Sequence, residues 1–216
     1  MLFRSQNAGG QQRGVRIAGG QAAGQGAQQR GVDISWLAND PDQDELTYNL
    51  YFRGEAEREW KLLEGDMKQN YFQLGPNSLP DGTYRLRVVA SDAAANPRAV
   101  ARSDQRISEP FLVDFTAPQI EVLGVDRTAA GGARATVRWR ATDAASFLTK
   151  AETALNADDV VPASPADGIV DSREETFATE LDNLSPAEQL LTIRVTDYAG
   201  NAGTGKAVLP PVAGGQ

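Results

Sequence analysis

Three carboxylates stand at alternate positions in a short acidic segment of the chain. They belong to Asp40, Asp42 and Asp44. Calcium takes about six to eight oxygen ligands, so side chains at this spacing in a loop could converge on one ion. The segment is not an EF-hand loop, because Glu45 stands where that loop has its glycine and Tyr51 where it has its bidentate glutamate. Two interpretations stay open: a calcium site, and a turn whose aspartates bond to nearby backbone.

A second candidate site is aromatic. Trp60 lies among glutamate, arginine and lysine residues, and Tyr51 has the outward parity of its own expected strand. An exposed aromatic pair could bind carbohydrate or protein, and the alternative is that Trp60 packs over the rim of the fold. Trp36 and Trp139 differ from Trp60, because they lie on the apolar side of alternating segments and are therefore predicted to be core residues.

Several kinds of chemistry are excluded by residue types that the chain lacks. There is no cysteine and no histidine, which removes thiolate chemistry, histidine metal ligands and the usual general base at neutral pH. There is also no phosphate-binding loop and no nucleophile-elbow motif. A carboxylate pair acting on a glycosidic bond would need a cleft, which small sandwiches do not offer in an obvious way. We therefore predict that the protein is not an enzyme and has no cofactor, apart from the candidate calcium ion.

The charge of the chain limits the kinds of partner that it can bind. A net charge of −8 argues against nucleic acid and against anionic membrane surfaces. No apolar run approaches the roughly 18 residues needed to span a bilayer, so membrane insertion is not expected. The first six residues lack the apolar stretch of a signal peptide. We expect the chain to be a piece of a longer, exported protein.

The sequence contains an internal repeat. Residues 32–40 return as residues 135–143, and residues 86–92 return as residues 191–197. Each second block ends in aspartate, with an asparagine four residues later, and side-chain bonds to turn backbone are expected there. A period of about one small domain predicts two modules rather than one larger fold.

Alternation of apolar and polar residues predicts many short strands. In the first half, strands are expected at residues 32–38, 46–52, 60–63, 71–74, 84–90 and 110–113. In the second half, they are expected at residues 119–123, 135–141, 151–155, 176–178, 191–195 and 206–209. Residues 144–157 leave a helical turn open as an alternative, and residues 162–168 are predicted to be a loop. The pattern predicts an all-β fold of two tandem Ig-like or fibronectin type III-like sandwiches.

Composition suggests the domain boundaries. Residues 1–30 are rich in glycine and glutamine and are expected to be a tail or linker, with a loosely held edge strand at residues 14–18 as the alternative. The first sandwich is placed at residues 31–116 and the second at residues 117–210, followed by a tail at residues 211–216. The arginines that alternate with core residues are predicted to cover a solvated sheet face; they are at positions 85, 87, 138, 140 and 194.

Three segments resemble known bacterial modules. Residues 79–92, with Leu-Pro-Asp-Gly-Thr-Tyr at their start, resemble bacterial fibronectin type III modules. Asp197-Tyr-Ala-Gly-Asn201 resembles the terminal turn of related bacterial Ig-like modules, and residues 114–118 are similar to their linkers. Tyr84 stands where a tyrosine corner would be, whereas Gln189 takes that position in the second copy, where a looser or differently bonded corner is expected.

The resemblance covers roughly residues 32–209, and it is specific for the fold and not for a function. Residues 50–63 look like stretches found behind β-propellers in large exported bacterial proteins. The resemblance thus implies an extracellular or periplasmic protein attached to other domains such as a β-propeller.

We expect a non-enzymatic spacer and protein-interaction module at a bacterial cell surface. The alternative is a calcium-stiffened adhesin or carbohydrate-binding module that uses the first sandwich. The protein or glycan partner is not specified by the sequence.

Overall fold

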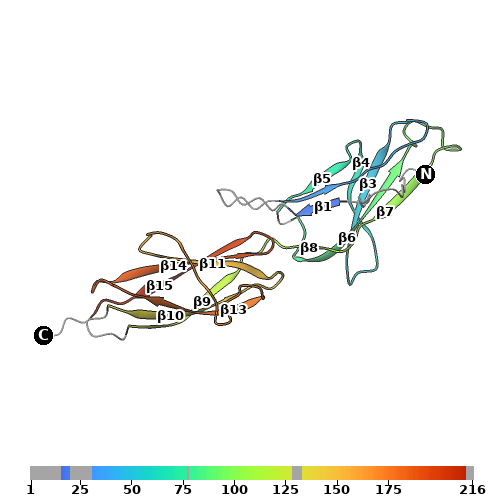
Figure 1. Ribbon diagram of the computed structural model, residues 1–216. Coiled ribbons are helices and arrows are strands. Elements are labelled where there is room, and N and C mark those ends of the chain that lie inside the picture. The colour runs from blue at the N-terminus through green and yellow to red at the C-terminus, as the bar shows by residue number, and fades with distance from the viewer. Residues whose placement is uncertain (1–15, 20–30, 77, 128–132, 213–216) are drawn as a thin grey trace. The chain divides into compact units, whose positions relative to one another are not determined.

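The computed structural model describes residues 16–19, 31–76, 78–127 and 133–212. All regular elements in these ranges are β-strands, and they divide between two compact units, of which one reaches Asp114 and the other begins at Phe115. Figure 1 shows each unit as strands in two layers. The chain is a tandem of two all-β sandwiches, as the alternation predicts. Among the described residues, no helix has the length and apolar composition that would cross a bilayer.

The first unit contains two antiparallel sheets. The smaller sheet has the order β1-β2-β5, and the larger has the order β4-β3-β6-β7, with β8 also paired to β6. The strands are β1 (Arg16–Gly19), β2 (Val32–Ser35), β3 (Thr47–Gly54), β4 (Lys61–Met67), β5 (Tyr71–Leu74), β6 (Gly82–Ser91), β7 (Ser103–Ile107) and β8 (Phe111–Val113). Their inward positions form the core, and Trp36 is almost fully buried there, as predicted.

The second unit also contains two antiparallel sheets. One sheet has the order β13-β10-β9 and the other has the order β12-β11-β14-β15. The strands are β9 (Gln119–Asp126), β10 (Ala135–Thr142), β11 (Leu148–Leu155), β12 (Val161–Pro162), β13 (Glu174–Leu181), β14 (Gln189–Asp197) and β15 (Ala202–Leu209). Trp139 is fully buried between the sheets, which confirms its prediction as a core residue.

The structure differs from the expected strands in three places. Ser103–Ile107 is a strand that the alternation did not predict, because its residues are mostly polar and lie at a sheet edge. Val161–Pro162 is a short strand that overlaps the predicted loop. Arg16–Gly19 is a strand that pairs with β2, so these residues form the edge strand that was the alternative to a tail or linker. In the alanine-rich segment, the strand interpretation is confirmed by β11.

The entrance to β6 is closed by a tyrosine corner. The hydroxyl of Tyr84 donates to the carbonyl oxygen of Pro80 at 2.9 Å, as the resemblance implied. Gln189, at the matching position of the second unit, is buried, and its Oε1 has no hydrogen-bond partner in the described part of the chain. At the start of β14, Gln189 Oε1 therefore does not take the place of the Tyr84 hydroxyl in a corner hydrogen bond.

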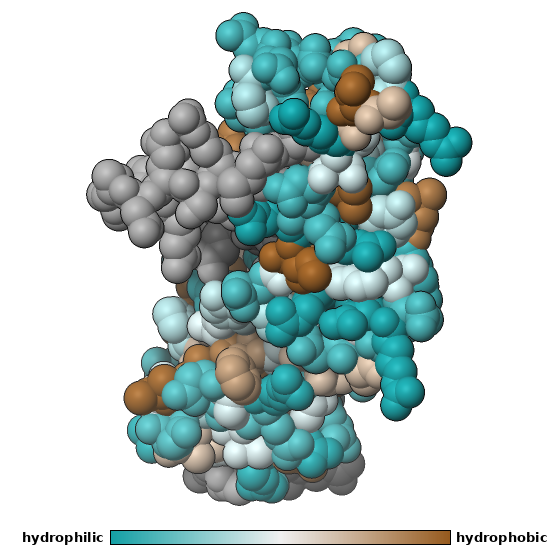
Figure 2. Space-filling view, turned by 90° about the vertical axis from the view of Figure 1, so that its right-hand side faces the viewer, coloured by the Kyte–Doolittle hydropathy of each residue, from teal (hydrophilic) through white to brown (hydrophobic). Residues whose placement is uncertain are grey.

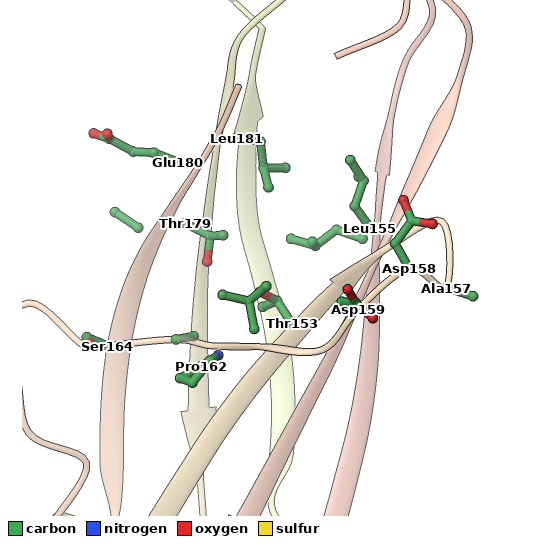
Figure 3. Close-up of a pocket in the computed structure, with 14 residues that line it drawn as sticks. Thr153, Leu155, Ala157, Asp158, Asp159, Pro162, Ser164, Thr179, Glu180 and Leu181 are labelled. Carbon is green, nitrogen blue, oxygen red and sulfur yellow. The ribbon is translucent and has the colours of Figure 1, made fainter. Parts of the chain in front are cut away.

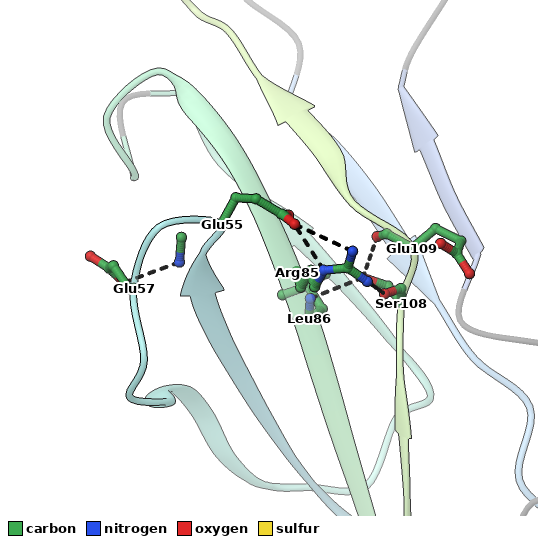
Figure 4. A network of polar contacts seen from close by, with 7 residues as sticks. Glu55, Glu57, Arg85, Leu86, Ser108 and Glu109 are labelled. Atoms are coloured by element: carbon green, nitrogen blue, oxygen red, sulfur yellow. Dashed lines mark hydrogen bonds and ion pairs between the residues drawn. The ribbon is translucent and has the colours of Figure 1, made fainter.

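A buried serine holds the chain between β7 and β8. Ser108 Oγ accepts a hydrogen bond from the backbone N–H of Leu86 at 2.9 Å and donates to the carbonyl of Glu109 at 2.7 Å. Arg85 reaches the same turn, because its Nη1 donates to the carbonyl of Ser108 at 3.5 Å. Figure 4 shows this network next to the ion pair of Arg85 with Glu55. It fixes the point where the edge of the larger sheet passes from β7 to β8.

Candidate functional site

The acidic segment of the first unit forms a closed loop after β2. Asp40 is buried, and its Oδ1 accepts the backbone N–H groups of Asp42 at 2.8 Å and Asp44 at 3.5 Å. Asn96 Nδ2 donates to Asp44 Oδ2 at 2.7 Å, which ties the loop to the end of β6. These bonds are the ones expected of an aspartate-capped turn.

The same loop also brings its carboxylates together. Each of Asp40, Asp42 and Asp44 offers one carboxylate oxygen, and these oxygens lie within 4.8 Å of one another. Asp42 is exposed and Asp44 is half-buried, so water could complete the ligand set of a calcium ion. The geometry is thus compatible with both interpretations of the acidic segment, because the turn bonds use Asp40 Oδ1 and leave Asp42 at the surface.

A second group of carboxylates lies at the end of β10 and β14. Asp143 and Asp197 are both buried, and each offers an oxygen within 4.8 Å of the other. Asp143 Oδ1 accepts the N–H groups of Ala145 and Ser146, at 2.9 and 2.8 Å.

The other oxygen of Asp143 distinguishes this group from the Asp40 loop. Asp143 Oδ2 is buried and has no hydrogen-bond partner in the described ranges. A buried carboxylate oxygen without a donor is costly unless a cation or a proton satisfies it. Sequence reasoning missed this group as a metal site, although the repeat contained a signal, because Asp143 is the counterpart of Asp40.

The aromatic pair lies on the outward face of the larger sheet of the first unit. Tyr51 on β3 is opposite Leu62 on β4 and opposite Arg87 on β6, and Arg87 is in turn opposite Ile107 on β7. These four residues therefore form one row across four strands, because residues opposite each other in antiparallel strands point to the same face. Leu62 and Ile107 are 58% and 51% exposed, so the ends of the row are open to solvent.

Trp60 joins this row through two arginines. The guanidinium carbon of Arg87 lies 4.5 Å from the ring centroid of Tyr51 and 5.0 Å from that of Trp60. Arg53 on β3 lies 4.9 Å from the Trp60 ring. The structure thus brings the two predicted aromatic residues together. From the sequence, Arg87 was predicted to cover a solvated sheet face and Arg53 was not predicted as a site residue, because both contacts depend on the register between strands. We call Tyr51, Arg53, Trp60 and Arg87 the cation–π cluster.

The two arginines of this cluster have no ion-pair partner among the described residues. In the described residues neither Arg53 nor Arg87 forms an ion pair, whereas the neighbouring Arg85 pairs with Glu55 at 3.3 Å. Trp60 is half-buried and its ring is in contact with both guanidinium groups. Ring area covered in this way is not available for stacking on a sugar, so the arrangement favours a protein ligand with carboxylates over a neutral carbohydrate.

One face of the protein can be judged from its surface residues. The view in Figure 2 is mostly hydrophilic, with hydrophobic residues in small separate groups. Such single apolar residues are normal on a folded protein. A binding surface must therefore be argued from specific contacts, as for the cation–π cluster, and not from a large apolar patch.

Comparison with known proteins gives matches of fold only. No protein-family model matches the chain, and no curated protein matches it. Among the similar solved structures are fibronectin type III domains, the class named by the sequence resemblance.

Three of these structures illustrate the likeness. The chicken CNTN1 FN1-FN3 domains are 16% identical, with 92% of this chain and 69% of that chain covered and a TM-score of 0.36. The CbhA fibronectin(III)-like modules of Clostridium thermocellum are 12% identical, with 92% and 94% covered and a TM-score of 0.40. A two-domain fibronectin type III segment of chicken tenascin is 13% identical, with 92% and 98% covered and a TM-score of 0.33. The sandwich architecture itself rests on the strand orders and registers given above.

Proposed function

We propose that this chain is a non-enzymatic spacer and protein-interaction module of an exported bacterial protein. The observation that carries the interaction role is the cation–π cluster, which places two arginines without ion pairs on an outward sheet face. The chain as a whole is acidic, with a net charge of −8. A cationic face on an acidic module orients an approaching partner and selects for a complementary acidic surface.

The partner of this face is a protein segment that carries carboxylates and at least one apolar side chain. Carboxylates would pair with the terminal nitrogens of Arg53 and Arg87, and the apolar group would contact Leu62 or Ile107 at the ends of the row. Arginine and aromatic residues together are typical of the residues that dominate binding at interfaces. The sandwich supplies the rigid support, since Tyr51 and Arg53 lie on β3 and Arg87 lies on β6. Trp60 directly precedes β4.

The test uses two sets of probes on the same protein. The protein would be exposed to a library of displayed acidic peptides and to an array of oligosaccharides. We expect binding of peptides that contain glutamate or aspartate, weakened by salt and lost in Arg87→Gln. Arg194→Gln is the matched control, because Arg194 is an exposed sheet residue of the second unit. Binding of oligosaccharides alone would support the adhesin alternative, and no binding to either set would contradict the interaction role.

A second candidate function is calcium-dependent stiffening. It is supported by the convergence of carboxylate oxygens within 4.8 Å in both acidic groups. An ion at either group would tie the end of one strand to a neighbouring loop and so restrict local opening. Isothermal titration of calcium into the protein tests it, with Asp42→Asn and Asp143→Asn separating the two groups; the absence of binding heat in the wild-type protein would contradict it.

A further inference from the structure

The second unit has a groove along one edge of its sandwich. It has a volume of about 990 Å³ and lies between β13 on one side and β11 with the β11–β12 turn on the other. Figure 3 shows the lining residues, which come from both sheets. Leu155 on β11 and Leu181 on β13 are half-buried residues of opposite walls, and the buried Leu191 on β14 lines the groove as well.

The groove exists because one segment crosses from one sheet to the other. Val161 pairs with Thr153 of β11, and the N–H of Ala163 then bonds to the carbonyl of Ala151 at 2.9 Å. Three residues later, the N–H of Ala166 bonds to the carbonyl of Thr176 on β13 at 3.1 Å. The crossing segment therefore covers the first half of β13 and leaves the second half beside the groove.

The second half of β13 presents backbone groups at this edge. β13 is the last strand of its sheet, with β10 on its other side. The carbonyl of Thr176 points to the edge, and backbone direction repeats every two residues along a strand, so the peptide groups of Glu180 point the same way. Side chains alternate with the same period, which turns Thr179 and Leu181 inward to the groove and Glu180 outward, as Figure 3 shows.

The rim of the groove is acidic. Asp158 and Asp159 in the β11–β12 turn and Glu180 on β13 are all exposed, and in the described ranges none of them forms an ion pair. The turn is held in place, because the side chain of Asn156 accepts the N–H of Leu190 at 2.9 Å. The N–H of Asp158 also bonds to the carbonyl of Leu155 at 2.8 Å. Three carboxylates thus stand around a groove whose mixed lining includes three leucines, Leu155, Leu181 and Leu191.

We propose that this groove receives an extended segment of a partner protein, in which an apolar side chain is flanked by lysine or arginine. The segment adds to the edge of β13 through the peptide groups of Glu180. Its apolar side chain lies between Leu155 and Leu181, and its basic side chains pair with Asp158, Asp159 and Glu180. Strand addition provides affinity through main-chain bonds and specificity through alternate side chains, and the acidic rim selects basic sequences. The charge preference is opposite to that of the cation–π cluster, and the site lies in the other unit, so the two proposals stand or fall separately.

The experiment selects ligands without assuming one. A display library of short random peptides would be panned against the whole protein, and an enriched peptide would be synthesised and followed by amide NMR. We expect enrichment of sequences with alternating apolar residues flanked by lysine or arginine. The largest shift changes should lie in residues 155–164 and 178–181. Raising the salt concentration from about 50 to about 500 mM should weaken binding.

Variants separate the groove from other surfaces. Asp158→Lys combined with Asp159→Lys should reduce the affinity by about tenfold or more, whereas Glu188→Lys, at an exposed position outside the groove, should leave it unchanged. Leu181→Gln tests the apolar contact, and far-ultraviolet circular dichroism checks that each variant is folded. Arg87→Gln should bind as the wild type does, which distinguishes this site from the cation–π cluster.

Three results would overturn the proposal. One is the failure of the library to yield any peptide that depends on the groove residues. Another is enrichment of acidic peptides that ignore Asp158 and Asp159. The third is self-association of the protein through β13, detected by sedimentation and abolished by Leu181→Gln, which would make a second copy the occupant.

Discussion

Trp139 on β10 stacks face to face on Phe177 of β13, with ring centroids 3.8 Å apart and planes 6° from parallel. The two residues are opposite each other in the register of neighbouring strands. The indole N–H of Trp139 also donates to Thr179 Oγ1 at 2.9 Å. In the first unit the repeated tryptophan, Trp36, meets Tyr48 edge-on at 5.4 Å instead, and its indole nitrogen has no partner in the described residues. The repeat thus preserves the tryptophan but not its partners.

Removing the stacked ring should destabilise the second sandwich. Phe177→Ala should lower its free energy of unfolding by about 3 to 5 kcal/mol, because it leaves a cavity against Trp139. The unfolding would be measured in urea from the amide NMR signals of β10 and β13. Phe147→Ala is the matched control, because Phe147 is 55% exposed and should change stability by much less. Equal effects of the two substitutions would contradict the stacking argument.

The tyrosine corner should stabilise the first sandwich only. Tyr84→Phe removes the hydrogen bond to Pro80 and should cost about 1 kcal/mol in the free energy of unfolding. Tyr198→Phe serves as the control, because this tyrosine is 62% exposed. Urea unfolding of both variants measures the difference, and an unchanged midpoint for Tyr84→Phe would show that the corner does not contribute.

Alkaline pH should weaken the first sandwich through Tyr48. Burial raises the pKa of the Tyr48 phenol above its ordinary value of about 10. The folded state therefore keeps a proton that the unfolded state releases. Stability is complete below about pH 10 and falls as the pH rises through the raised pKa of the folded state, by at most about 1.4 kcal/mol per pH unit for one group. Burial, assisted by the charge of Glu57, shifts the pKa of Tyr84 in the same direction.

The contribution of Tyr48 can be isolated by substitution. Tyr48→Phe keeps the ring against Trp36 and removes the ionisable group, so its loss of stability between about pH 9 and pH 11 should be smaller than that of the wild type. The measurement is the urea midpoint of the first unit across this pH range. Parallel curves for the two proteins would show that Tyr48 does not link folding to pH.

How far the sequence predicts the structure depends on the range of the contacts. The period of two along each strand is local, and it predicted the buried positions of Trp36 and Trp139 and the strand in residues 151–155. Ser103–Ile107 was missed, because an edge strand exposed to solvent needs no apolar alternation.

The candidate sites depend on contacts that a single sequence does not contain. Arg87 contacts Tyr51 because β3 and β6 pair in one particular register, and the β3–β4 register shifts at Leu50, which is not visible in the residues themselves. The approach of Asp143 to Asp197 likewise depends on how β10 and β14 end in space. For Tyr51 and Trp60 the residue types indicated a candidate aromatic site, whereas the fold brought Arg53 and Arg87 to it.

The two sheets of the second unit approach closely at Gly205. A Cβ atom added to Gly205 on β15 would lie 2.7 Å from Ile120 Cγ2 on β9. Gly205→Ala should therefore destabilise the unit by about 1 to 3 kcal/mol. Ile120→Ala in the same protein should remove the clash, so the loss in the double variant should be smaller than the sum of the two single losses.

The control for this substitution is another glycine in a strand. Gly124→Ala on β9 would meet only the flexible end of the Arg138 side chain, at 3.2 Å, and should be tolerated. Thermal unfolding of the wild type, the two single variants and the double variant gives the coupling free energy between Gly205 and Ile120. Gly124→Ala is measured beside them. Additive effects of Gly205→Ala and Ile120→Ala would mean that the two residues do not limit the distance between the sheets.

Calcium should change the effect of Asp143→Asn on the stability of the second unit, so that the variant is less stable than the wild type only when calcium is present. Without calcium, Asp143→Asn should leave the stability of the second unit unchanged or raise it, because the amide oxygen can still accept the N–H groups of Ala145 and Ser146 while one buried negative charge is removed. With calcium at about 100 times its dissociation constant, the wild type should gain about 2.7 kcal/mol and the variant much less.

Asp159→Asn, an exposed change in the same unit, should follow the wild type in both conditions. Thermal melts with calcium and with chelator measure the four comparisons. A wild-type melt that is the same with calcium and with chelator would rule out a stabilising ion at this group, and the parallel experiment with Asp42→Asn decides the same question for the loop of the first unit.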